Sequence, residues 1–138
     1  MWLTVRSGGV GLVGVVVLHG ELDLATQPAL ERGLAVLLRG GYTRVVADLG
    51  GVGFADLSGL RPLVRAQRQV RSDGGWLRLA GPPRSARRIL AVTDLGDILP
   101  VYPDVYEAFA DRDGKGVPPV PRDGGQDGMG DRAGLPQG

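Results

Sequence analysis

The sequence contains no cysteine and only one histidine, His19, among its 138 residues. The absence of cysteine excludes disulfide bonds, thiolate catalysis and cysteine-ligated zinc. A single histidine excludes metal sites that need several imidazoles, and His19 follows an apolar run that is typical of a core or rim position. The Gly-x-Ser-x-Gly pattern of serine hydrolases is also absent. We therefore expect no metal, no cofactor and no enzymatic activity.

The sequence also lacks a strong charge bias and a long hydrophobic run. Sixteen basic residues nearly balance fifteen acidic residues, for a formal net charge of +1, so the composition does not predict a nucleic-acid or anionic-membrane partner. The longest apolar run, residues 10–18, is too short to span a bilayer and contains two glycines. It has no preceding basic region typical of a signal peptide. We expect a cytoplasmic protein without membrane insertion.

Apolar periodicity predicts a domain that alternates strands and helices. Runs rich in valine and leucine predict four strands, at residues 2–6, 13–19, 45–49 and 76–80. Glycines at 8–9 and 50–53 are interpreted as turns. Apolar residues at helical spacing predict four helices, at about 27–39, 60–70, 83–92 and from 103 onward. The order predicts an α/β fold with a mixed four-stranded sheet and packed helices.

The composition changes after Asp111, where glycine, proline, aspartate and arginine dominate. Such a segment buries too little apolar surface to offset the entropy of ordering its backbone. We therefore expect one folded domain over residues 1–111, followed by a disordered Gly/Pro-rich tail over residues 112–138.

The segment with the clearest chemistry follows the third predicted strand, where Asp56 and Ser58 lie near the start of a helix. Side-chain oxygens of serine and aspartate are favoured there, because they accept hydrogen bonds from free backbone N–H groups. The Ser58 hydroxyl is therefore interpreted either as a helix cap or as a phosphate acceptor. A phosphate at this position would also meet the positive end of the helix dipole.

Three motifs occur in order on the predicted elements: GELD at 20–23, VADL at 46–49 and DLSGL at 56–60. With these motifs, residues 2–109 resemble the STAS-domain anti-sigma factor antagonists of bacteria. The resemblance implies that Ser58 is phosphorylated by a serine kinase that is also the anti-sigma factor. The unphosphorylated protein then binds this kinase and frees the sigma factor for transcription. Phosphorylation releases the kinase, and a serine phosphatase resets the protein.

The resemblance also implies a partner-binding surface that includes Asp23, Asp56, Leu57 and Gly59. Asp23 is interpreted either as a surface acid beside Ser58 or as a turn residue. Leu57 departs from the family, in which a small or hydroxylated residue often precedes the phosphorylated serine. Pro62 also lies close to the helix start and has no N–H for the Ser58 carbonyl, so we expect an altered geometry there.

Two other functions remain open from the sequence. A STAS-like domain also serves as a non-switching accessory subunit of a transporter or a stress-signalling complex. Alternatively, a cleft near Asp23, Asp56 and Ser58 belongs to an enzyme or a small-ligand binder. The missing histidine, cysteine and phosphate-loop patterns argue against this last possibility.

Overall fold

The computed structural model describes residues 2–119. Within them, five strands form one mixed sheet in the order β1-β2-β3-β4-β5. The prediction of four strands was therefore wrong by one, since β5 was not predicted. The strands are β1 (Leu3–Val10), β2 (Val13–Leu22), β3 (Arg44–Ala55), β4 (Trp76–Ala80) and β5 (Val101–Tyr102). The β1–β2 pair is antiparallel and the other pairs are parallel. Two residues between prolines carry no detectable period, which is why β5 escaped prediction.

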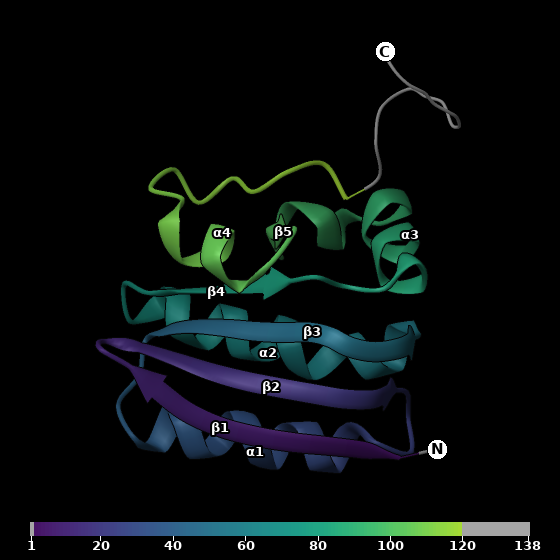
Figure 1. The fold of residues 1–138 in the computed structure, drawn as a ribbon, viewed down its shortest axis with the longest axis horizontal. Coiled ribbons are helices and arrows are strands. Elements are labelled where there is room, and N and C mark those ends of the chain that lie inside the picture. Colours follow the sequence, from purple (N-terminus) through teal and green to yellow (C-terminus); the bar gives the residue numbers. More distant parts are fainter. Residues whose placement is uncertain (1, 120–138) are drawn as a thin grey trace.

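The helices follow the predicted order along the chain. They are α1 (Gln27–Arg39), α2 (Leu57–Ser72), α3 (Arg84–Val92) and α4 (Val105–Ala110), with a 3-10 helix η1 (Asp94–Asp97) after α3. Figure 1 shows α1 and α2 behind the sheet, running along the strands. Each parallel strand is followed by a helix at its carboxyl end, so the amino-terminal ends of α1 and α2 lie at the same edge of the sheet.

The predicted turn at residues 7–9 is wrong, because β1 continues to Val10 and the hairpin turns at Gly11. Gly11 has a φ of 61°, a left-handed conformation that glycine adopts without steric cost. Gly9 instead pairs with Gly14 inside the hairpin. A Cβ at Gly9 would collide with the Tyr42 ring, so this glycine serves close packing.

The predicted flexible turn at residues 50–53 is also wrong, since β3 runs on to Ala55. Gly51 pairs with His19 of β2, and the register shifts on either side of this pair. A Cβ at Gly51 would collide with the His19 imidazole. A glycine inside a strand often marks such a close approach, and here it gives β3 the length that carries it to the start of α2.

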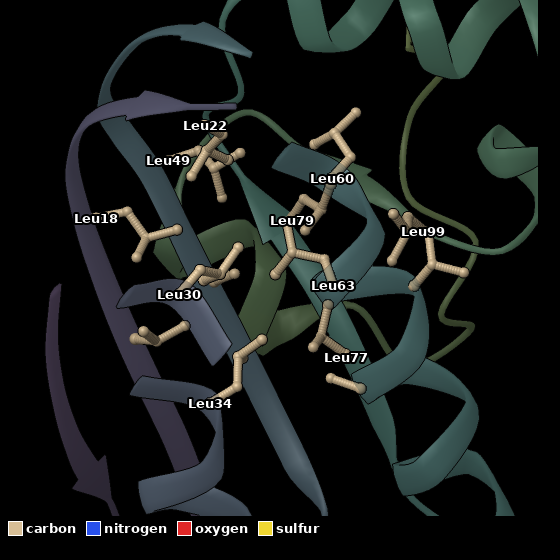
Figure 2. Packing of buried hydrophobic residues seen from close by; sticks show 14 of the residues in the cluster. Leu18, Leu22, Leu30, Leu34, Leu49, Leu60, Leu63, Leu77, Leu79 and Leu99 are labelled. Atoms are coloured by element: carbon tan, nitrogen blue, oxygen red, sulfur yellow. The ribbon is translucent and has the colours of Figure 1, made fainter. Parts of the chain in front are cut away.

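The main hydrophobic core lies between one face of the sheet and helices α1, α2 and α3. Figure 2 shows the leucines that fill this layer, contributed by strands and helices alike. Fully buried members include Leu18, Leu30, Leu60, Leu63 and Leu79. Each such side chain contributes about 1.5–3 kcal/mol relative to an exposed one. This packing therefore fixes α1 and α2 rigidly against the sheet.

A smaller cluster covers part of the opposite face, where α4 packs on β4 and β5. The buried Arg78 stacks on the Trp76 ring at 3.8 Å and donates to the carbonyl oxygens of Ala108 and Asp111. Beyond α4 the chain returns to β5, where the Val117 amide donates to Val101 at 2.8 Å. The sequence did not predict this contact for residues 112–119. The rest of the expected tail, residues 120–138, lies outside the described residues.

Candidate functional site

The candidate site is the turn from β3 into α2, where Asp56 is the N-cap of the helix. One carboxylate oxygen, Oδ1 of Asp56, accepts the Gly59 amide at 3.0 Å and the Ser58 hydroxyl at 2.8 Å. Ser58 is therefore the second residue of the helix, and the interpretation of Ser58 as the cap is wrong. Ser58 is a partly exposed residue, and its hydroxyl donates to the side chain of Asp56.

Pro62 lies inside α2, so the helix cannot supply the amide that would normally bond the carbonyl of Ser58. The side chain of Gln27, at the start of α1, donates to this carbonyl through Nε2. The altered geometry expected at Pro62 therefore takes the form of a hydrogen bond from a second helix. An unpaired carbonyl in a partly buried place is costly, so this bond fixes the backbone of Ser58.

Asp23 is 6% exposed in the loop between β2 and α1, so the expectation of a surface acid is wrong. Its Oδ1 atom accepts the Thr26 amide at 3.0 Å, and the Thr26 hydroxyl accepts the Asp23 amide at 3.0 Å. This reciprocal pair is the turn role that the sequence left open. Asp23 thus shapes the loop, and any influence on a partner acts through the conformation of that loop.

The loop containing Asp23 packs directly on the first turn of α2. The Asp56 amide donates to the Leu22 carbonyl at 3.0 Å. A Cβ at Gly59 would collide with the backbone of Leu22 and Asp23. Gly59 is therefore required by this close approach, and it is buried rather than part of the exposed surface. The structure brings Asp23, Asp56, Ser58 and Gly59 together, with Asp23 and Gly59 buried beside the partly exposed Ser58.

Large apolar side chains are exposed around this turn. Leu57 is 40% exposed and Phe54 is 41% exposed, on either side of Ala55 and Asp56. Leu24, in the neighbouring loop, is 68% exposed. The sequence indicated Leu57 but not the other two, because an apolar residue in a predicted turn or strand end is ordinarily assigned to the core. Exposed apolar residues beside polar ones are typical of protein-binding surfaces.

Within residues 2–119, no cluster of three or more histidine, cysteine, aspartate or glutamate side chains is placed to hold a metal ion. The hydroxyl of Ser58 bonds a carboxylate, whereas His19 lies on β2 against Gly51. None of the helices in this described part is both long enough and apolar enough for a membrane span.

The comparisons with known proteins agree with this geometry. Residues 8–100 match the family model described as "Mlab, STAS domain", and the chain therefore belongs to the STAS domain family. A protein of Thermotoga neapolitana named as a candidate anti-sigma factor antagonist is 30% identical over 78 residues, which cover 56% of this chain and 69% of the relative. A second such protein, BtrV of Bordetella bronchiseptica, is 30% identical over 87 residues, which cover 63% of this chain and 75% of the relative.

Among solved structures, an anti-sigma factor antagonist from Mycobacterium paratuberculosis superposes with a TM-score of 0.71 at 27% identity. The match covers 78% of this chain and 92% of that one. The phosphorylated form of SpoIIAA from Bacillus has the same fold, with a TM-score of 0.61 at 19% identity. That match covers 77% of this chain and 96% of SpoIIAA. The relatives are thus named as anti-sigma factor antagonists, and the fold of this chain is the STAS fold.

Proposed function

We propose that this protein is an anti-sigma factor antagonist that is switched by phosphorylation of Ser58. The unphosphorylated form binds an anti-sigma factor that is also a serine kinase, and it thereby frees a sigma factor for transcription. Phosphorylation ends this binding and a serine phosphatase restores it. The protein acts in the cytoplasm by binding rather than by catalysis.

One observation carries the proposal: the hydroxyl of Ser58, a partly exposed residue, donates to Asp56 at the start of α2, beside the exposed side chain of Leu57. A hydroxyl in this position is accessible to a kinase, and the apolar side chain offers a contact to a partner. The names of the relatives support the same class of partner.

Phosphorylation would change this turn in two ways. It removes the hydroxyl proton that Ser58 now donates to Asp56. It also adds about −1.5 to −2 charges next to that carboxylate. Both changes oppose an apolar or acidic partner over Leu57. A loss of a few kcal/mol weakens binding by on the order of a hundredfold or more, which is enough for a switch.

The test compares tagged full-length Ser58→Ala and Ser58→Asp proteins expressed in the source cells. We expect an ATP-binding kinase partner to copurify with the alanine variant and to be lost from the aspartate variant. Ser72→Asp, at the opposite end of α2, is the matched control and should retain the partner. Identical partners on both Ser58 variants, transport proteins among them, would instead identify a non-switching accessory subunit.

A further inference from the structure

A phosphate on Ser58 would meet the partial positive charge of the helix amino terminus, but it would also lie beside the full negative charge of Asp56. The Gly59 amide is already bonded to Asp56, at 3.0 Å. Asp56 is itself an acid, and its Oδ1 atom lies 2.8 Å from the hydroxyl that would carry the phosphate. A dianion at this distance from a carboxylate is strongly disfavoured unless a cation lies close by. The inference below rests on the proposed phosphorylation of Ser58.

Arg61 lies one helical turn beyond Ser58 on α2 and is exposed. It lines a surface groove of about 500 Å³ between α2 and η1, whose lining includes the apolar Leu57, Val64 and Leu95 and the charged Arg65, Arg68 and Asp94. Within residues 2–119, the ion pair that forms joins Arg65 to Glu31 and leaves the Arg61 guanidinium without a carboxylate partner. Arg61 is thus a free cation next to the switch residue.

Helix geometry places this guanidinium within reach of a phosphate on Ser58. Residues three apart on a helix have their Cβ atoms about 5–6 Å apart. Helical side chains also tilt toward the amino terminus, so Arg61 covers the turn that contains Ser58. Guanidinium presents donors in a fork that matches two phosphate oxygens. We propose that Arg61 binds the phosphate of phosphorylated Ser58.

This contact would couple the modification to the shape of the surface. When Arg61 turns toward Ser58, its side chain leaves the groove beside Leu57. Phosphorylation then alters both the charge at Ser58 and the walls of the groove next to the exposed leucine. A partner that binds over Leu57 meets a different surface in the two states, in addition to the direct repulsion by phosphate.

The experiment uses the full chain with phosphoserine incorporated at position 58 during translation, so it needs no kinase. Phosphorus NMR titration gives the second pKa of the phosphoserine, whose ordinary value is about 6. We expect the phosphoserine pKa to be higher in Arg61→Gln than in the otherwise unchanged chain, by a few tenths of a unit, because the guanidinium stabilises the dianion. Arg61→Lys should fall between them. The control, Arg68→Gln, lies ten residues from Ser58, or about 15 Å along the helix, and should leave the pKa unchanged.

Equal pKa values in the parent chain and Arg61→Gln would overturn the proposal, as would equal rises in Arg61→Gln and Arg68→Gln. A second measurement needs no substitution: the Nε–Hε NMR signal of Arg61 should shift between the serine and phosphoserine forms, and an unmoved signal would contradict the contact. Because phosphoserine is installed directly, these outcomes are independent of whether a kinase uses Ser58. A chain that binds phosphate through Arg61 but meets no kinase would separate the two proposals.

Discussion

The side chain of Gln27 donates a hydrogen bond to the carbonyl oxygen of Ser58, the carbonyl that Pro62 leaves without a helical donor. This bond joins the first turn of α1 to the first turn of α2 across the loop that contains Asp23. The backbone of the candidate switch is therefore held by a residue 31 positions earlier in the chain. A substitution that removes the Gln27 side-chain amide therefore removes this donor from the Ser58 carbonyl.

Replacement of Gln27 by alanine tests this relationship. The Ser58 carbonyl would lose its protein donor, and we expect a loss of about 1 kcal/mol in the free energy of unfolding. Urea denaturation measures the loss, and amide exchange should increase in the first turn of α2. The matched control is Gln69→Ala, an exposed glutamine of α2, which should change stability by less than about 0.5 kcal/mol. Equal stability of the two variants would show that the Gln27 bond is dispensable.

Gly59→Ala should push the first turn of α2 away from the loop between β2 and α1. Its Cβ would collide with the backbone of Leu22 and Asp23, so a shift of the loop or of α2 is required. We expect a destabilisation of about 1–3 kcal/mol, as for overpacked cores, together with weaker capture of the partner. Thermal unfolding and copurification measure the two effects. Gly53→Ala is the control, because a Cβ there meets open space. If Gly59→Ala matches this control, the close approach has no energetic role.

The hydrogen bond from the Tyr102 hydroxyl to Asp111, at 2.8 Å, predicts how stability depends on pH. This bond, with further help from the Gly116 amide, lowers the pKa of Asp111 below its ordinary value of 3.8. As the pH falls, the Asp111 carboxylate takes up a proton in the unfolded chain before it does so in the folded chain. The stabilisation that this carboxylate gives the folded chain is therefore present above pH 3.8 and is lost as the pH falls through the lowered pKa. Tyr102→Phe should lose less stability than the parent chain in acid, measured by urea unfolding from pH 6 to pH 2, since it lacks the bond.

At alkaline pH, Tyr102 makes the stability of the fold change with pH in the opposite direction. Burial, and next the bond to Asp111, raise the pKa of Tyr102 from 10.0 to about 12. Between these two values the unfolded chain has released the phenolic proton and the folded chain has kept it. Stability should therefore fall as the pH rises from 10 to 12 in the parent chain. The Tyr102→Phe variant should show a smaller fall over this interval, and an equal fall would contradict the assignment.

Local sequence patterns determined the four helices, the cores of the four longer strands and the position of Ser58 near a helix start. Leucines at helical spacing predicted α1, and the run from Val45 to Leu49 predicted the core of β3. Asp56 and Ser58 were placed correctly near a helix start, because capping depends on residues only two or three positions apart. The motifs on these elements also indicated the STAS family, which the family match confirms.

Tertiary structure alone decided what depends on distant residues. The glycines at 50–53 extend β3 because His19 lies beside Gly51, and a turn signal cannot reveal that neighbour. Asp23 is buried where its loop packs on Gly59, and the Thr26 amide bonds its Oδ1 atom there. Short-range periodicity records which side of an element is apolar, but it does not record which element will cover that side. The exposure of Phe54 and Leu24 and the support of Ser58 by Gln27 therefore follow only from the packed fold. The same holds for Arg61, which forms no ion pair within residues 2–119.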